Sequence, residues 1–340
     1  CAGDVASAIV RQVAGTVGYF HHQGCCQLPP DLDRVTETLI SLGKSPNVAA
    51  VLVVSLGCEG TDHERLTAEI RKTGKPVRII RIQELGGVSA AIKAGIDAAQ
   101  ELVMLVSGIQ RQPVSIDRIT MAIKCGASDT TSGMASNCVV GYVADKLVDL
   151  GATVVFGETT EFLGGEHLLA RRAVNPEVSD KIYEIVNRME ARARSLGCDM
   201  RKGQPTPGNI EGGLSSIEEK SLGAIVKSGT RPIQGVMEYP ETIGQRKGLW
   251  IKDTPGREPE ILTGMAATGA QFMMFSTGRG APQGFPTMPV LKVCGNPNTY
   301  ERMSHDMDIN AGRIITGEKS IEEVGEEAFS AILDLLSGKQ

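Results

Sequence analysis

Short runs of apolar, often β-branched residues alternate along the chain with longer stretches in which apolar residues recur about every 3.6 positions. The short runs predict strands buried on both faces at residues 49–56, 77–82, 102–106, 120–124, 152–156, 249–251, 271–275 and 290–293. The helical periodicity covers residues 31–42, 61–73, 89–100, 141–150, 179–196 and 321–336. Strands that alternate with helices predict an α/β fold with mostly parallel sheets and crossover helices.

Two packed α/β domains are expected, because 340 residues are enough for two hydrophobic cores. The polar residues 110–113 favour a boundary that gives a Rossmann-like α/β domain at residues 1–112 and a C-terminal catalytic α/β domain at residues 113–340. Residues 199–214 are polar and rich in Gly and Pro, so they predict a long loop, a feature that is usually functional or mobile in a compact domain.

The composition excludes some classes of partner. A net charge of −5 argues against nucleic acid, because a phosphate-binding surface needs an excess of basic residues. No apolar run reaches the roughly 18 residues of a membrane-spanning helix, and no signal peptide is visible. Eight cysteines in 340 residues are too few for a disulfide framework. We therefore expect a cytoplasmic protein that contacts neither nucleic acid nor a membrane.

Five predicted strands end in a glycine next to a polar or reactive side chain. These turns lie at residues 57–60, 125–129, 157–161, 276–280 and 294–296. Ligands of open parallel sheets bind beyond the carboxyl ends of the strands, so the turns suggest one shared polar site. The alternatives are structural: Ser128 and Asp129 suit a helix N-cap, and 277–280 suits a plain turn. The same turn also offers N–H groups and the Arg279 guanidinium to a carboxylate.

Residues 21–27, His-His-Gln-Gly-Cys-Cys-Gln, form the densest cluster of soft metal ligands in the chain. A single His or Cys is more often an ordinary surface or core residue, but two of each within six residues favour a metal. The spacing is not that of a zinc finger. A metal shared with Cys58 and Cys125 is possible, and thiolate with imidazole favours iron or zinc over magnesium.

Glu158, Glu161 and His167 lie within ten residues of one another after a predicted strand. A carboxylate beside a metal or an arginine can act as a general base when its pKa is tuned. The structural alternatives are a solvated turn for the two carboxylates and a helix start for His167.

Seven collinear motifs together resemble the family of altronate and galactarate dehydratases over nearly the whole chain. The motifs lie at residues 21–27, 45–59, 124–137, 151–161, 206–229, 275–280 and 307–312. Members of that family eliminate water from sugar acids and depend on ferrous iron. The family also includes sulfolactate sulfo-lyases, which expel sulfite and use a separate small subunit.

The resemblance implies Fe²⁺ as the cofactor, with His21, Cys25, Cys58 and Cys125 as its candidate ligands. Gln23 departs from the pattern, because members often have a second His there. Several cysteines around one site would also suit an iron–sulfur cluster. The family's small substrate-side domain is not in this chain, so a small partner subunit or domain and an oligomeric enzyme are expected.

The mechanism implied by the resemblance is β-elimination from a small hydroxy acid anion. Its base would be Glu158 or Glu161, with Asp129 second and His167 as a further candidate. The candidate substrate-binding residues are Lys124, Ser128, Ser132, Asn209, Thr277 and Arg279. The main hypothesis is a sugar-acid dehydratase, and the first alternative is the large subunit of a sulfolactate sulfo-lyase. A non-catalytic ligand-binding module is the second alternative, although no GxGxxG motif joins a predicted strand to a helix.

Overall fold

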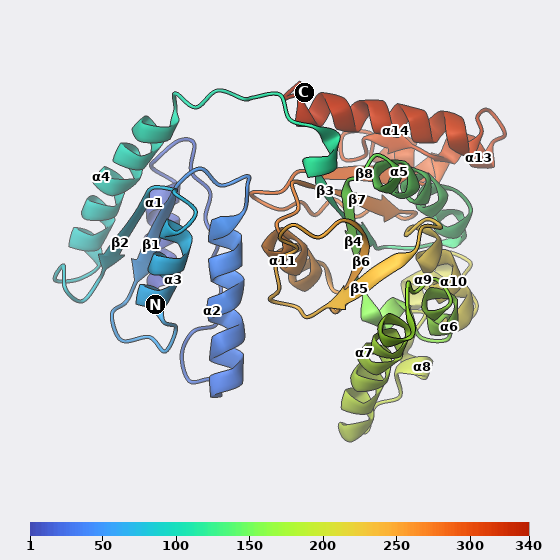
Figure 1. The fold of residues 1–340 in the computed structure, drawn as a ribbon, viewed down its shortest axis with the longest axis horizontal. Coiled ribbons are helices and arrows are strands. Elements are labelled where there is room, and N and C mark those ends of the chain that lie inside the picture. Colours follow the sequence, from blue (N-terminus) through green and yellow to red (C-terminus); the bar gives the residue numbers. More distant parts are fainter. Residues whose placement is uncertain (340) are drawn as a thin grey trace.

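The structure is a computed structural model that describes residues 1–339. It contains a two-stranded parallel sheet, β1-β2, and a seven-stranded sheet in the order β5-β6-β4-β3-β7-β8-β9, in which every pairing is parallel. The two sheets lie in separate halves of the molecule, each covered by helices (Figure 1). The predicted α/β class with parallel sheets is confirmed.

The first half contains the small sheet and four helices. Its elements are α1 (Ala2–Val10), α2 (Pro29–Lys44), β1 (Val51–Ser55), α3 (His63–Arg71), β2 (Val77–Arg81) and α4 (Val88–Val106). Because side chains alternate along a strand, Leu52 and Val54 of β1 pack with α1 and α4, whereas Val51 and Val53 pack with α2 and α3. The helices therefore cover both faces of this sheet.

The strand predicted at residues 102–106 is wrong, since these residues form the last turns of α4. The buried residues Ala91, Gly95, Ala99 and Leu102 continue one helical face through the apolar run. No glycine or proline interrupts the sequence between Ala99 and Gly108. A short apolar run at the end of a helix has the same sequence pattern as a buried strand. Here the helical spacing of the buried residues continues into the run and identifies it as helix.

The second half is built on the large sheet, and its strands are almost entirely buried. Its strands are β3 (Thr120–Cys125), β4 (Thr153–Phe156), β5 (Ile233–Met237), β6 (Gly248–Lys252), β7 (Phe272–Thr277), β8 (Val290–Cys294) and β9 (Ile309–Asn310). Its longer helices are α5 (Asn137–Asp149), α7 (Pro176–Ser195), α10 (Ile217–Val226), α11 (Glu258–Thr268) and α14 (Ile321–Leu336). Its short elements are η1 (Ile116–Arg118), η2 (Ser132–Ser136), η3 (Thr159–Glu161), α6 (Glu166–Ala170), α8 (Met200–Gly203), α9 (Pro207–Glu211), α12 (Pro297–Arg302) and α13 (Gly312–Ile315).

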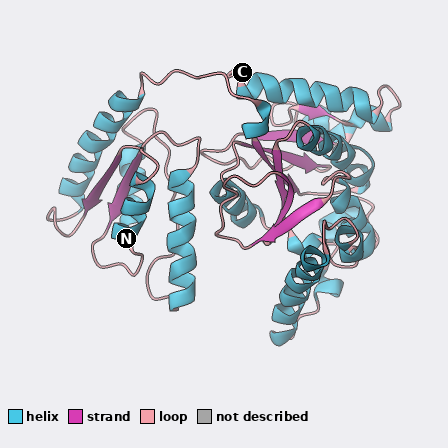
Figure 2. Ribbon diagram, in the orientation of Figure 1, coloured by secondary structure: helices cyan, strands magenta, loops and turns pink. Residues whose placement is uncertain are grey.

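Helices also cover both faces of the large sheet (Figure 2). Helices α5, α7 and α14 share one core with Met121 and Ile123 of β3. Helix α11 shares the other core with Ala122 of β3 and with Leu42 of α2. The long loop predicted at residues 199–214 is wrong in part, because this segment contains α8 and α9, which begin after the capping residues Asp199 and Thr206.

A coil at residues 107–115 crosses from the first half to the second (Figure 2). The boundary predicted near residues 110–113 lies within this coil and stays a prediction. The halves also touch through α2 and the loop after it: Ser41 Oγ lies 3.3 Å from the Pro240 carbonyl, and Asn47 Nδ2 lies 2.7 Å from the Gln271 carbonyl. No helix within residues 1–339 is both long enough and apolar enough to cross a membrane.

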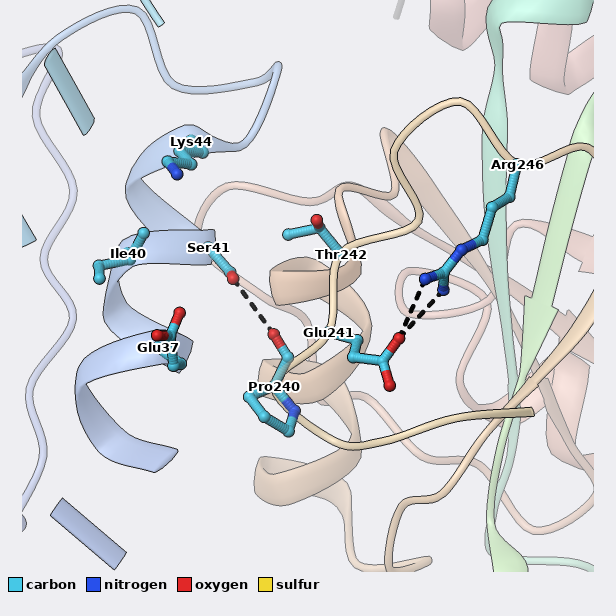
Figure 3. Close-up of a pocket in the computed structure, with 8 residues that line it drawn as sticks. All are labelled: Glu37, Ile40, Ser41, Lys44, Pro240, Glu241, Thr242 and Arg246. Carbon is cyan, nitrogen blue, oxygen red and sulfur yellow. Dashed lines mark hydrogen bonds and ion pairs between the residues drawn. The ribbon is translucent and has the colours of Figure 1, made fainter. Parts of the chain in front are cut away.

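Figure 3 shows a pocket of about 310 Å³ at this contact. Glu37 and Lys44 of α2 line one wall, and Glu241 and Arg246 line the other. Glu241 and Arg246 form an ion pair of 3.1 Å across the second wall. None of the predicted site residues lines this pocket.

Candidate active site

Four of the five polar turns lie side by side. Strands β4, β3, β7 and β8 are consecutive neighbours in the large sheet, and all run in the same direction. The turns at residues 157–161, 125–129, 276–280 and 294–296 therefore meet at one edge of that sheet. The fifth turn, residues 57–60, follows β1 in the other sheet.

A buried cluster of charged side chains lies at the ends of β3 and β4. Lys124, Lys227 and Glu158 are each no more than 1% exposed. The Glu158 carboxylate accepts hydrogen bonds from Lys227 Nζ at 2.6 Å, from Lys124 Nζ at 3.2 Å and from the Cys125 N–H at 2.9 Å. Lys227, the C-cap residue of α10, also lies 3.0 Å from Cys125 Sγ. Glu158 therefore bridges two lysines that approach from different elements.

These contacts decide the charges of the cluster. Burial opposes the ionisation of Glu158, but Lys227 and Lys124 outweigh it and hold the pKa of Glu158 below its usual range. Burial alone would lower the pKa of Lys227, but the neighbouring Cys125 and Glu158 raise it. Burial and the Glu158 charge raise the pKa of the Cys125 thiol to about 11. The cluster thus holds a carboxylate, two ammonium groups and a neutral thiol near pH 7.

Three non-glycine residues adopt positive φ within residues 1–339, and all three lie in motifs that the sequence singled out. They are Glu158 at 70°, Ala127 at 49° and Cys26 at 55°. Hydrogen bonds hold two of them: the Glu158 N–H donates to Thr254 Oγ1 at 2.9 Å, and the Ala127 carbonyl accepts from the Arg279 N–H at 2.8 Å. Such conformations cost free energy and concentrate at functional sites.

Asp129 is buried in the turn after β3 and is saturated with donors. Its carboxylate accepts from Thr131 Oγ1 at 2.6 Å, from the Ser132 N–H at 3.2 Å and from Asn296 Nδ2 at 3.0 Å. Gly278 packs so closely that a Cβ there would lie 2.0 Å from Asp129 Oδ1. Position 278 therefore has to be glycine for the turn after β7 to pack this closely against the turn after β3.

Helix α9 covers this edge of the sheet. Asn209 Nδ2 donates to the Ser128 carbonyl at 2.9 Å. The Arg279 guanidinium donates to the Gly208 carbonyl at 2.9 Å and to the Glu211 carboxylate at 2.7 Å. Thr277 is buried, and its hydroxyl accepts from the Gly280 N–H at 3.1 Å. These candidate substrate-binding groups are thus gathered at one place, where they hold the turns together, and their role toward a substrate stays a prediction.

The two remaining candidate bases have different surroundings. Glu161 in η3 is half-buried, and its Oε1 lies 3.0 Å from Lys220 Nζ on α10. His167 in α6 is exposed. The structure therefore brings Glu158, Asp129 and Glu161 to the edge of the large sheet and leaves His167 on the surface.

The N-terminal motif lies in the other half of the molecule. The Gly24 carbonyl accepts from the N–H groups of Gly60 at 2.8 Å and Thr61 at 3.0 Å, which holds residues 21–27 against the turn after β1. His21, Cys25 and Cys58 are exposed, whereas Cys125 is buried beside Lys227 in the second half.

The four candidate metal ligands do not form a coordination shell. Within residues 1–339, no three His, Cys, Asp or Glu side chains are grouped so that they could hold a metal ion. The residues therefore do not fit an iron ion or an iron–sulfur cluster in this arrangement of the two halves, and iron stays a prediction from the resemblance.

Besides Lys220, which pairs with Glu161, sequence reasoning missed three more deeply buried lysines. Lys227 is the C-cap residue of α10 in the motif at 206–229, Lys252 is the last residue of β6, and Lys292 interrupts the otherwise apolar strand β8. Each of them is no more than 4% exposed. A lysine at a core position of a buried strand is a usable signal, because a buried ammonium group needs compensation. Lys124 carries the same signal in β3.

Comparisons with known proteins cover both halves. Residues 116–340 match the family model described as D-galactarate/altronate dehydratase, C-terminal. Residues 1–107 match the model described as D-galactarate dehydratase/altronate hydrolase, second domain.

Several relatives match most of the chain. It is 39% identical over 98% of its length to a (2R)-sulfolactate sulfo-lyase subunit beta from Chromohalobacter salexigens, of which it covers 85%. It is 36% identical over 89% of its length to a galactarate dehydratase (L-threo-forming) from Escherichia coli, of which it covers 59%. It is 31% identical over 94% of its length to an altronate dehydratase from Bacillus subtilis, of which it covers 63%.

Proposed function

Because the chain belongs to the D-galactarate/altronate dehydratase family, we propose that it is the large subunit of a lyase that acts on a small hydroxy acid anion. The buried lysines at the ends of β3 and β8 support an anionic substrate. The polar edge of the large sheet is the expected place for a ligand in a parallel α/β fold. A non-catalytic binding module has less support, because the relatives are named as lyases.

The leaving group that we propose is sulfite. The observation that carries this choice is sequence identity: the chain is 39% identical to a sulfo-lyase subunit beta over 98% of its length, against 36% and 31% for two dehydratases. The main hypothesis from the sequence, elimination of water from a sugar acid, becomes the second candidate. The 36% identity to a galactarate dehydratase keeps it open.

The proposed reaction converts sulfolactate to pyruvate and bisulfite. A base removes the proton on the carbon that carries the hydroxyl and the carboxylate. The electron pair of that C–H bond forms a C=C bond, and the C–S bond breaks with its pair on sulfur. The resulting enol takes up a proton at the terminal carbon and gives up its hydroxyl proton, which yields pyruvate, and the expelled sulfite takes up one proton as bisulfite.

Glu161 is the better candidate for the base among the predicted carboxylates. Both oxygens of Glu158 accept hydrogen bonds from cationic or N–H donors, which lowers its pKa and its basicity. Asp129 accepts from three donors of its own turns. Glu161 has one ion-pair partner, Lys220, and is less buried than Glu158. In this scheme Glu158 positions the two lysines, and Glu161 moves the proton.

We propose a small partner subunit, because the sulfo-lyase relative is named as one subunit of an enzyme. Iron remains a separate proposal, and no step of the reaction above is assigned to it. Turnover measured with and without added ferrous iron tests it, and equal rates in both would contradict iron dependence.

The test is an assay of the purified chain with a small sulfo-lyase subunit supplied in trans, against sulfolactate, altronate and galactarate. We expect sulfite and pyruvate in equal amounts from sulfolactate, and no product from the two sugar acids. A keto acid formed only from a sugar acid would overturn the proposed leaving group. No product from any of the three would overturn the lyase proposal itself.

A matched pair of variants tests the base. Glu161→Gln should lower kcat by about 100-fold, in the range that general base catalysis contributes. Glu184→Gln is the control, because Glu184 is exposed on α7 and far from the strand ends in sequence. An equal loss in both variants, or in neither, would contradict the assignment.

A further inference from the structure

Lys292 is a buried lysine without a counter-ion. It lies on β8, two residues before the strand ends, and is 4% exposed. Its ammonium group has one hydrogen-bond acceptor, the main-chain carbonyl of Gln283. Within the described residues it forms no ion pair at 4.0 Å or less, although Lys124 on the neighbouring part of the sheet forms two.

An aromatic ring connects these two lysines. Lys124, Phe275 and Lys292 are register partners on the adjacent strands β3, β7 and β8. The Nζ atoms of Lys124 and Lys292 lie 4.7 Å and 3.9 Å from the centroid of the Phe275 ring. A cation on an aromatic face is stabilised by less than a cation paired with a carboxylate, so Lys292 is undercompensated.

The surrounding charges do not supply the missing partner. Burial and the Lys124 charge lower the pKa of Lys292 to about 8, against the weaker opposite effects of Asp308, Glu258 and Asp306. Glu258 contacts Lys124 at 3.4 Å, and Asp308 accepts from the main-chain N–H of Lys292.

The cover over Lys292 is the coil that contains Gln283. Pro282, Gln283 and Gly284 are exposed and belong to no helix or strand. The Gln283 carbonyl is a neutral acceptor, and an oxyanion in its place would give the ammonium group both a charge partner and further acceptors. Lys252 on the same face differs in its hydrogen bonds: it has two acceptors within the protein, the Glu241 carbonyl at 2.8 Å and Thr268 Oγ1 at 2.6 Å, where Lys292 has one.

We propose that Lys292, beside Phe275 and Lys124, binds the sulfonate group of the substrate by taking it in exchange for the Gln283 carbonyl. This inference rests on the proposed function, because it assigns one of the two anionic groups of sulfolactate. The carboxylate is left to the other donors at the strand ends. Lys292 is then a specificity-determining residue, because lactate has the same carbon skeleton without the sulfonate.

The first experiment follows the titration of Lys292 itself in the full chain labelled with [ε-¹³C]lysine, with Lys292→Arg to identify the resonance. Sulfate and sulfolactate should each raise the pKa of Lys292 by at least about one unit, since an adjacent opposite charge has effects of that size. Lactate should leave it unchanged, and Lys252 should respond to none of the three. An unchanged pKa of Lys292 with both sulfate and sulfolactate would overturn the proposal.

The second experiment measures affinity in matched variants. Lys292→Met should weaken sulfolactate binding by about 10- to 100-fold, as expected for the loss of hydrogen bonds to a charged group, and should leave lactate binding unchanged. Lys252→Met, the control for loss of a buried lysine on the same face, should change neither. Equal weakening of both ligands by Lys292→Met would assign Lys292 to the carboxylate and overturn the proposal. The sulfate response is read without turnover, so it stays informative if no sulfite is released.

Discussion

The two parallel sheets of the molecule both end in cysteine-containing turns, but they surround the thiol in opposite ways. Cys58, after β1, is exposed, and its sulfur accepts from the neutral amide of Gln83 at 3.2 Å. Cys125, at the end of β3, is buried, and its sulfur lies 3.0 Å from the Lys227 ammonium. The small sheet therefore offers accessible soft ligands, whereas the large sheet holds a fixed cluster of charges. Cysteine reactivity follows exposure and nearby charge, so the thiols of the two turns are expected to differ in reactivity.

The largest effect should come from removing the central carboxylate of the buried cluster. Glu158→Gln leaves Lys227 without an anionic partner and should lower the free energy of unfolding by about 3–5 kcal/mol, as is typical when one side of a buried ion pair is removed. Urea unfolding at pH 7 measures this loss. The double variant Glu158→Gln with Lys227→Met should recover part of it, and no recovery would contradict the pairing.

The same carboxylate predicts a loss of stability in acid. The pKa of Glu158 is below its usual range in the folded protein, so the unfolded state binds its proton first as the pH falls. The contribution of Glu158 is complete above the ordinary Glu pKa of about 4.3 and is lost as the pH falls through the lower folded value. The stability of the wild type should fall more steeply below about pH 5 than that of Glu158→Gln. Parallel curves would show that Glu158 does not cause the acid sensitivity.

Removal of Lys292, unlike removal of Glu158, should stabilise the folded protein, because the buried ammonium group has no anionic partner. Lys292→Met should raise the free energy of unfolding by about 1–3 kcal/mol at pH 7, since a buried lysine with a lowered pKa penalises folding wherever the unfolded chain binds a proton. That penalty is complete below about pH 8 and is lost as the pH approaches the unfolded value of about 10.4. The advantage of the variant should therefore shrink between these limits. Chemical unfolding at pH 7 and pH 10 checks the sign, and a variant that is less stable at both would contradict it.

The smallest effect on stability is expected at the thiols of the small sheet. Cys58→Ser and Cys25→Ser should each change the free energy of unfolding by less than about 0.5 kcal/mol, because both residues are exposed. In the native wild type, Cys25 and Cys58 should react with a thiol reagent within the time in which Cys125 and Cys294 remain unmodified. Peptide mass spectrometry after labelling measures this order. Early labelling of Cys125 would contradict the proposed difference between exposed thiols near the small sheet and protected thiols in the large sheet.

Hydrophobic periodicity predicted much of the fold correctly. The elements that it missed have local causes. The helix predicted at residues 321–336 and the core of β7 were confirmed, because each has a complete apolar pattern and clear ends. Strands β5 and β9 were missed: Gln234 and Gly235 interrupt the first, and the second has only two residues. Short elements of this kind depend on the neighbouring strand for their stability, and that neighbour is distant in sequence.

The candidate site was predictable where it depends on topology. Parallel strands bring their carboxyl ends to one edge, so the proximity of the turns holding Cys125, Glu158 and Thr277 follows from their place after strands. The approach of Lys227 to Cys125 does not follow, because it depends on how α10 packs, 102 residues away along the chain. The hydrogen bond from Asn296 to the Asp129 carboxylate likewise could not be predicted from the sequence, because it depends on the tertiary fold.

Helix α2 contributes to one hydrophobic core in each half of the molecule. Ile40 packs with α3 and β2 in the first half, and Leu42, two residues later, packs against α11 and the large sheet. Amide hydrogens of α2 should therefore exchange through openings that involve both halves, so that the two sheets share one cooperative unit. The His21–Gln27 segment leads directly into this helix, and so its stability is tied to the core beneath the opposite sheet.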